Sequence, residues 1–307
     1  MKTKSVNCLG IIVVDALSGP FDHYPRWGRE AQVVSPKVEF KVGGGAANSA
    51  AALARLRVPT GIFAKLGQDS NGAFALGSLK HAGVRTNGVR LSLKESTPFT
   101  FVGIRLDGDR TFVHTPGANL SFGINDLDMA RLLKADFLFY QDYWILPRLD
   151  GTPAARLLKR ARKAGVTTFL DECWGLGPHR ASLEKALPFA DYFLPSYDDL
   201  TAAYGRYEPE TLARLLQKCG ARKIVLKLGK RGCLLWDGAT ARRIPACARK
   251  VVDTTGAGDC FDAGFIAAVA RDYTDEEACE IGQRAAAACV GQYGGTIGKV
   301  TFEKLVS

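Results

Sequence analysis

The sequence predicts an α/β fold, a three-layer α/β/α sandwich with a mostly parallel central sheet and a small second β-sheet. Two patterns support this prediction. Short apolar runs rich in Val, Ile and Leu alternate along the chain with helical segments, which is typical of parallel strands buried on both faces. Two other segments, 31–42 and 97–115, alternate polar and apolar residues, which indicates strands with one exposed face.

The elements of the central sheet and its helices are expected in regular alternation. The first strand, 6–14, is continuously apolar and ends at Asp15. Glycines 83 and 165 close two of the helices, and the acidic run 275–277 favours the amino end of the last one. The expected strands are 6–14, 61–65, 135–141, 166–171, 191–194, 223–228 and 233–237. The expected helices are 46–57, 71–82, 153–164, 197–204, 258–271 and 275–293.

The two alternating segments predict a separate sheet. Residues 97–105 and 110–115 form an expected hairpin about the turn LDGD. We expect this sheet to fold as a lid over the carboxyl ends of the main strands, where ligands bind in open α/β sheets. The chain 1–307 is then one domain, with a lid formed by about 16–42 and 97–117.

Composition narrows the class of protein. Of 307 residues, 47% are hydrophobic and 23% charged, which is ordinary for a globular protein, and the formal net charge is +10. The basic runs 227–231 and 242–250 are not interleaved with aromatic residues, so a phosphate-bearing small ligand is favoured over nucleic acid. No apolar run approaches membrane-spanning length, and the eight cysteines form no C-x-x-C pair. We expect a soluble cytoplasmic protein with reduced thiols.

The run VDTTGAGD at 252–259 carries the strongest chemical signal. Gly256, Ala257 and Gly258 lead directly into an apolar helix, where backbone N–H groups and the helix dipole favour an anion. Asp259 would lie at the start of that helix, within reach of the same anion. Taken alone, Asp259 could equally be an ordinary first-turn carboxylate.

This run closely resembles the C-terminal signature of the PfkB (ribokinase-like) carbohydrate kinase family. The resemblance implies an ATP-dependent kinase that uses Mg²⁺. It also implies that the amides of Gly256, Ala257 and Gly258 form an anion hole and that Asp259 is the catalytic base.

Other landmarks of the family follow in the expected order. The stretch 42–56 resembles its N-terminal signature, which implies that Gly43, Gly44 and Asn48 contact substrate hydroxyls. Ribokinases proper have a lysine where this chain has Gly45, which disfavours ribose as the substrate. Asp15 matches a carboxylate that accepts hydrogen bonds from two sugar hydroxyls in the family. An Asp at the end of a strand is also commonly structural. The stretch 63–72 also matches, and Asp69 within it is expected to be structural.

The nucleotide side is expected to involve Lys227, Gly229 and Gly232, which resemble the family's nucleotide-binding loop. The family's N-x-x-E motif is altered here. Ser196 replaces Asn and Asp199 replaces Glu, so Ser196 is assigned to nucleotide binding and Asp199 to Mg²⁺ through water.

Two further matches complete the expected site. Asp253 and Thr255 match positions that help to bind a monovalent cation in several relatives, so K⁺ is a candidate cofactor. Residues 142–144 either line the sugar pocket or form a plain surface loop.

The function predicted is phosphoryl transfer from ATP to a hydroxyl, expected to be primary, of a small carbohydrate. A nucleoside kinase of the same fold is the first alternative, with Phe99, Phe101 and Phe112 available to hold a base. A non-catalytic sugar or nucleotide sensor is the second, because the motif at 196–199 is altered. The sequence has no P-loop of the form G-x-x-x-x-G-K-[ST]. A homodimer formed through the lid is a further expectation, since its edge strands are open to pairing.

Overall fold

The computed structural model describes residues 3–24, 28, 34–106, 109–173, 179–247, 250–292 and 294–307. A central sheet has the strand order β14-β13-β12-β11-β10-β9-β1-β4. Neighbours from β4 to β12 pair in parallel, and the last two pairings, β12 with β13 and β13 with β14, are antiparallel. Its strands are β1 (Val6–Leu9), β4 (Thr60–Phe63), β9 (Phe137–Tyr143), β10 (Thr167–Glu172), β11 (Tyr192–Phe193), β12 (Lys223–Lys227), β13 (Cys233–Trp236) and β14 (Ala241–Ile244).

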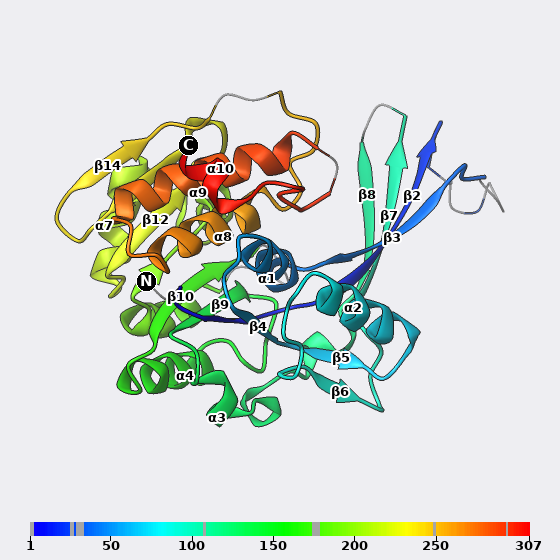
Figure 1. Cartoon of the computed structure of the whole chain (residues 1–307), viewed down its shortest axis with the longest axis horizontal. Coiled ribbons are helices and arrows are strands. Elements are labelled where there is room, and N and C mark those ends of the chain that lie inside the picture. The colour runs from blue at the N-terminus through cyan, green and yellow to red at the C-terminus, as the bar shows by residue number, and fades with distance from the viewer. Residues whose placement is uncertain are drawn as a thin grey trace.

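Helices cover both faces of this sheet (Figure 1). Alternate strand residues enter opposite cores: Phe137 and Phe139 pack with α1, α8 and α9, whereas Leu138 and Tyr140 pack with α4 and α7. The helices are α1 (Gly45–Arg55), α2 (Ser70–His81), α3 (Met129–Leu132), α4 (Thr152–Lys163), α5 (Arg180–Ala186), α6 (Tyr197–Tyr204), α7 (Pro209–Lys218), α8 (Ala257–Val269), α9 (Asp275–Val290) and α10 (Phe302–Val306). The predicted three-layer sandwich is confirmed.

Local sequence explains several helix ends. Thr274 and Glu277 form a capping box at the start of α9, which satisfies backbone N–H groups there. Asp69 caps α2 by accepting the N–H of Gly72, and it also accepts the N–H and hydroxyl of Thr97. Asp69 is therefore structural, as predicted. The last of the predicted helices is shorter than expected: α9 ends at Val290, and Tyr293 lies outside the described residues.

A second, four-stranded sheet has the order β3-β2-β7-β8. Its strands are β2 (Val13–Phe21), β3 (Val38–Gly43), β7 (Phe99–Arg105) and β8 (Arg110–Thr115). It projects from one end of the molecule, at the upper right of Figure 1. The hairpin of β7 and β8 is confirmed, while the strand expected at 31–42 begins at Val38 and its residues 31–33 lie outside the described part.

The prediction of one continuous strand over 6–14 is wrong. The chain leaves the central sheet after Leu9 and joins the second sheet at Val13. Gly10 marks the break, because a Cβ there would lie 2.5 Å from Asp142 Oδ2. The next amide, of Ile11, donates to Asp142 instead of to a strand. One apolar run thus serves two sheets.

Several short elements were not predicted. They are β5 (Lys65–Gly67), β6 (Arg90–Ser92), β14, α3, α5, α7, α10 and the 3-10 helices at Gly117–Leu120, Ile124–Asp126, Leu187–Phe189 and Gly229–Arg231. Among the residues that the structure describes, we find no helix with the length and apolar character needed to traverse a bilayer.

Candidate active site

The amino end of α8 is the centre of the site. Its N-cap, Gly256, has a φ of 69°, and a Cβ there would lie 2.5 Å from the Cα of Gly295, so only glycine fits. Ala257 and Gly258 form the first turn. The Ala257 N–H donates to Thr254 O at 3.2 Å, and neither N–H belongs to the i→i−4 hydrogen bonds of the helix. Asp259 lies in the same turn, as predicted.

Two neutral side-chain amides hold the carboxylate of Asp259. Asn48 Nδ2 donates to Oδ2 at 2.8 Å, and Gln141 Nε2 donates to Oδ1 at 2.7 Å. Burial raises the pKa of Asp259 to about 6, although both hydrogen bonds and nearby Lys227 lower it. Asn48 was expected at the site and Gln141 was not. The signal for Gln141 was its place as the first polar residue in the buried strand β9.

Asp142, the next residue, anchors the glycine run that precedes α1. Its carboxylate accepts the N–H groups of Ile11, Gly45 and Ala46 at 2.9, 3.0 and 2.9 Å. Burial raises its pKa to about 7. A Cβ on Gly45 would lie 2.3 Å from Asp142 Oδ1, so this carboxylate explains why glycine stands where a lysine was expected of ribokinases.

The three residues 142–144 have different roles. Asp142 is buried and lines a cavity, so the surface-loop interpretation is wrong for it. Tyr143 and Trp144 pack in the core shared with α4 and α7, where the Tyr143 hydroxyl donates to Ser182 O. Tyr143 and Trp144 are not among the residues that line the cavity beside Asp142.

The cavity beside Asp142, named here cavity A, has a volume of about 350 Å³ and lies beneath the four-stranded sheet. Its polar lining includes Asp15, whose pKa is raised by burial, and Thr100. A Cβ on Gly43 would lie 2.2 Å from Asp15 Oδ2, so glycine is required for this carboxylate to fit. The remaining lining is Ile11, Val13, Leu17, Gly44, Gly45, Val102, Arg110, Phe112, His114, Pro116, Asp142, Ile145, Cys173 and Thr255.

The three phenylalanines proposed to hold a nucleoside base do not all reach cavity A. Phe112 lines it. Phe99 and Phe101 do not, because Thr100 and Val102 of the same strand point into the cavity and alternate residues point away. The expectation for Phe99 and Phe101 is therefore wrong.

Cavity B, of about 470 Å³, lies on the other side of the α8 amino end. The predicted residues Lys227, Gly229 and Gly232 line it together with Ala257 and Gly258. Gly232 has a φ of 91°, and a Cβ there would lie 2.0 Å from Ile244 O. The segment 254–258 separates the cavities, because Thr255 faces A whereas Thr254, Ala257 and Gly258 face B.

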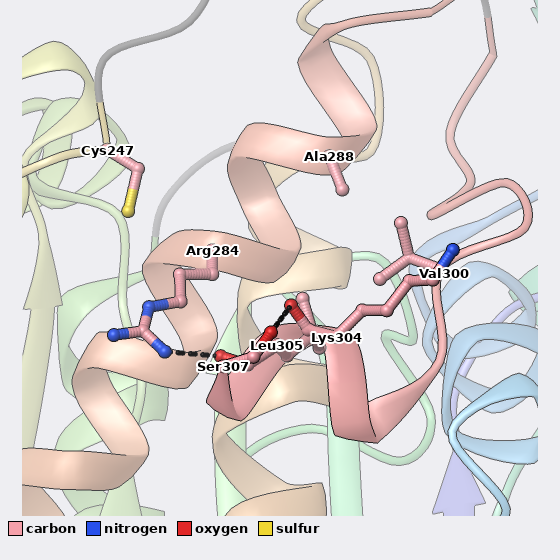
Figure 2. Close-up of a pocket in the computed structure, with 7 residues that line it drawn as sticks. All are labelled: Cys247, Arg284, Ala288, Val300, Lys304, Leu305 and Ser307. Carbon is pink, nitrogen blue, oxygen red and sulfur yellow. Dashed lines mark hydrogen bonds between the residues drawn. The ribbon is translucent and has the colours of Figure 1, made fainter.

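A third cavity, of about 610 Å³, lies between α9 and α10 (Figure 2). Arg284 points toward the chain end there and donates to Leu305 O at 2.6 Å. Cys247 belongs to the walls of both this cavity and cavity B. None of the predicted site residues lines it.

Lys227 joins cavity B to a group of buried acids. Its Nζ donates to Asp171 Oδ2 and to Asp262 Oδ2, each at 2.9 Å. Burial alone would lower the pKa of Lys227, but the two carboxylates raise it above its usual range. A Cβ on Gly258 would lie 3.6 Å from this ammonium group, so its charge adjoins the amides of the turn.

The altered motif at 196–199 lies beside the same acids. The N–H of Ser196 donates to Glu172 Oε1 at 2.9 Å. Burial and the nearby Asp171 raise the pKa of Asp199. Among the described atoms, Glu172 Oε2 and Asp171 Oδ1 are buried without a hydrogen-bond partner. No group of three or more His, Cys, Asp or Glu in the described ranges is arranged to hold a metal. Oxygen donors fit Mg²⁺, and these residues suit contact through water.

The candidate monovalent-cation residues are already occupied. Asp253 Oδ1 accepts the N–H and hydroxyl of Thr255 at 3.0 and 2.8 Å, and Oδ2 accepts the N–H of Gly294 at 3.0 Å. Arg110 Nη1 lies 3.2 Å from Asp253 Oδ1 and 2.8 Å from Thr255 Oγ1. Burial would raise the pKa of Asp253, but these donors lower it to about 2. These residues do not fit a K⁺ ion.

A helix amino end between two cavities, with the buried carboxylate of Asp142 lining one and Lys227 lining the other, fits the class of small-molecule kinases. The family description "pfkB family carbohydrate kinase" matches residues 4–301. The chain belongs to this family, which confirms the resemblance of its motifs, and it is a phosphotransferase with an alcohol group as acceptor.

Relatives agree along nearly the whole chain. An ATP-dependent ribose-1-phosphate kinase of Halopiger xanaduensis is 31% identical over 273 residues, covering 89% of this chain and 88% of the relative. A ribokinase of Arabidopsis thaliana is 29% identical over 296 residues, covering 91% and 75%. The structure of Arabidopsis thaliana ribokinase complexed with ribose and ATP superimposes with a TM-score of 0.86 at 25% identity, covering 99% of this chain and 98% of that one.

Proposed function

We propose that this kinase transfers the γ-phosphate of ATP to a hydroxyl group of a small carbohydrate, with Asp259 as general base. One observation carries the proposal: the amino end of α8 lies between the two cavities, with Thr255 lining cavity A, Ala257 and Gly258 lining cavity B, and Asp259 in the same first turn. The acceptor occupies cavity A and ATP occupies cavity B. The transferred group crosses at the amino end of α8.

Asp259 removes the proton of the attacking hydroxyl. A pKa of about 6 leaves the carboxylate mostly ionised at neutral pH yet basic enough to accept a proton. Asn48 and Gln141 fix the orientation of its two oxygens before the acceptor binds. Upon binding, an acceptor hydroxyl competes for the Asn48 amide, which is the family's implied role for this residue.

The charge of the phosphoryl group is met by the chain itself. The amides of Gly256, Ala257 and Gly258 form the anion hole, with the dipole of α8 behind them. Lys227 adds a full positive charge close to Gly258. This arrangement is preorganised, because Asp171 and Asp262 hold Lys227 in place before ATP binds.

Mg²⁺ accompanies ATP in this proposal. Asp199 and Glu172 would hold it through water, and Ser196 lies against the nucleotide. The ion neutralises charge on the phosphates while they are transferred. Gly229 and Gly232 allow the backbone to approach the nucleotide closely.

The acceptor is recognised in cavity A by Asp15, by the backbone at Gly43 and Gly44, and by Asn48. The four-stranded sheet closes over it and excludes water. Gly45 and the packed Asp142 leave no room for the lysine of ribokinases, so an acceptor other than ribose is favoured. Phe112 and Ile145 in the wall are the observation that supports a nucleoside as the second candidate.

Asp259→Asn tests the assignment of the base. Turnover should fall by about 10²–10⁴ because proton removal is lost, while ATP binding measured by calorimetry stays close to that of the wild type. Asp128→Asn, an exposed helix cap on α3, is the matched control. Near-normal turnover by Asp259→Asn would contradict the proposal.

A panel of pentoses, hexoses, sugar acids, sugar phosphates and nucleosides tests the acceptor. ADP release with a sugar, and none with nucleosides, is the expected result. Preference for a nucleoside would favour the second candidate. Binding of sugar and ATP without ADP release from any acceptor would instead indicate the sensor.

We also propose a homodimer formed through the outer face of the four-stranded sheet. A cross-strand row of Phe40, Phe101 and Val113 faces away from cavity A and is 53%, 37% and 61% exposed. Such a contiguous apolar row is typical of an interface. Sedimentation should give a dimer for the wild type and a monomer for Phe101→Asp; a monomeric wild type at high micromolar concentration would contradict the dimer.

A further inference from the structure

Arg110 connects the four-stranded sheet to the segment that leads into the anion turn. It begins β8, at the edge of that sheet, and its guanidinium reaches past the wall of cavity A. Nη1 donates to Thr255 Oγ1 at 2.8 Å and lies 3.2 Å from Asp253 Oδ1. The side chains of Arg110 and Asp253 are 23% and 5% exposed, so this ion pair is largely shielded from water.

Asp253 ties together the two loops that shape the anion turn. Its carboxylate clamps Thr255 on one side and the N–H of Gly294 on the other. The Gly294 loop in turn packs on Gly256, where no Cβ could be placed. Unlike Asp142 and Asp259, which have only neutral donors, Asp253 also lies 3.2 Å from a guanidinium, and a positive charge at this distance stabilises the ionised carboxylate.

Among the described cations near Asp253, Arg110 is the one that pairs with it directly. Lys41 of β3 approaches the same loop, with its Nζ 3.3 Å from the position of a Cβ on Gly294, but it pairs with Glu39 at 3.5 Å. Lys227 on the cavity B side is paired with Asp171 and Asp262. A K⁺ ion at Asp253 Oδ1 would have to displace the guanidinium or lie against a like charge.

We propose that Arg110 is the counter-ion of Asp253 in place of a bound monovalent cation, and so positions the anion turn. Turnover then needs no added K⁺. Because the guanidinium comes from the edge of the four-stranded sheet, the position of that sheet also sets the geometry of the turn. The effect on turnover rests on the proposed function of the 256–258 amides.

Arg110→Met tests this inference, with Arg90→Met on the exposed strand β6 as the matched control. Turnover is measured in buffers whose only monovalent cation is tetramethylammonium, and again with K⁺ or with millimolar guanidinium. The turnover of the wild type and of Arg90→Met should differ by about twofold or less among these buffers. Arg110→Met should lose about 10- to 100-fold without a small cation and recover part of that loss when K⁺ or guanidinium is added.

A second measurement does not require turnover, so its failure is distinguishable from failure of the proposed function. The thermal midpoint of Arg110→Met should rise when K⁺ replaces tetramethylammonium, whereas that of the wild type should not move. If Arg110→Met does not fold, Arg110→Met/Asp253→Asn removes both charges and should restore folding. A wild type whose turnover depends tenfold on K⁺, or an Arg110→Met variant insensitive to every cation, would overturn the inference.

Discussion

The acids on the two sides of the α8 amino end are held in opposite ways. Asp259 and Asp142, the latter lining cavity A, are contacted by neutral N–H groups, from two side-chain amides and three backbone amides respectively. Toward cavity B, Asp171 and Asp262 share the ammonium group of Lys227. All four of these acids are buried or partly buried, yet of the four only Asp171 and Asp262 form a direct ion pair with a described cation.

The difference matches the chemistry proposed for each side. Neutral donors offset part of the desolvation, and the pKa values of Asp259 and Asp142 stay near neutrality, at about 6 and about 7. A proton can therefore move on and off Asp259. A lysine between two carboxylates instead stays protonated, because Asp171 and Asp262 raise its pKa, although burial also raises the pKa of Asp262. Variants on each side sharpen this comparison.

The largest effect is expected from Lys227→Met. It leaves Asp171 and Asp262 buried without a counter-ion, which should lower the free energy of unfolding by about 3–5 kcal/mol in urea titrations. Lys163→Met, exposed on α4, should change it by less than about 0.5 kcal/mol. Adding Asp262→Asn to Lys227→Met should recover part of the loss. A decrease below 1 kcal/mol for Lys227→Met would show that the two sides do not differ as described.

Gly45→Ala comes next and tests the cavity A side. Its Cβ would lie 2.3 Å from Asp142 Oδ1, so the carboxylate must leave the backbone amides that it holds. We expect a loss of about 1–3 kcal/mol in the free energy of unfolding and a higher KM for the acceptor. The control is Gly77→Ala on α2, where a Cβ meets nothing within 4 Å and helix propensity should add stability. Equal stability of the two variants would contradict the role of Asp142.

Gln141→Leu should change the pH profile of turnover. The hydrogen bond from Gln141 lowers the pKa of Asp259, so its removal should raise that pKa by about one unit. The proposed base is active only when Asp259 is ionised, so turnover of the wild type should fall as the pH drops through about 6. In the variant, the acidic limb of the pH profile should move to higher pH. Its loss of turnover relative to the wild type should therefore be larger at pH 6 than at pH 8. Gln217→Leu, far away beside Gly238, should leave the limb unmoved.

The smallest effect is expected from Asp199→Glu on the cavity B side. The longer side chain restores the carboxylate of the family's motif and should lower the Mg²⁺ concentration for half-maximal turnover by a few fold. Asp198→Glu, exposed on the same helix turn, is the control. A weaker Mg²⁺ response in Asp199→Glu would assign the ion to the other acids near Lys227.

The sequence predicted the parts of the site that are local in the chain. The glycines of 256–258 and the start of α8 are properties of one turn, and the family motifs indicated Asp15, Gly43, Gly44 and Asn48 as candidate substrate contacts. Gln141, Glu172 and Arg110 were not found, because each acquires its partner only through tertiary contacts more than 20 residues away in the chain. The contact that Arg110 makes with Asp253 was not predicted for the same reason, since no residue near Asp253 in the sequence indicates it.

In the fold, too, local features were predicted and features that depend on tertiary contacts were not. Helices with clear periodicity and caps were located within a few residues. The prediction of one strand over 6–14 was wrong because an apolar run is equally suited to either sheet. Gly10 was the one residue in this run that indicated where the chain leaves the first sheet. Tyr143 and Trp144 follow a polar pair, yet positive φ values at Asp142 and Trp144 turn the chain back into the core.

The thin wall at 254–258 has a thermodynamic consequence. Thr255 lines cavity A, whereas Thr254, Ala257 and Gly258 line cavity B. If a ligand in one cavity shifts this backbone, the shape of the other cavity changes as well. The two ligands should therefore bind as a heterotropic pair, each changing the affinity for the other by the same factor. Calorimetry of ATP with and without the acceptor would give that coupling free energy directly.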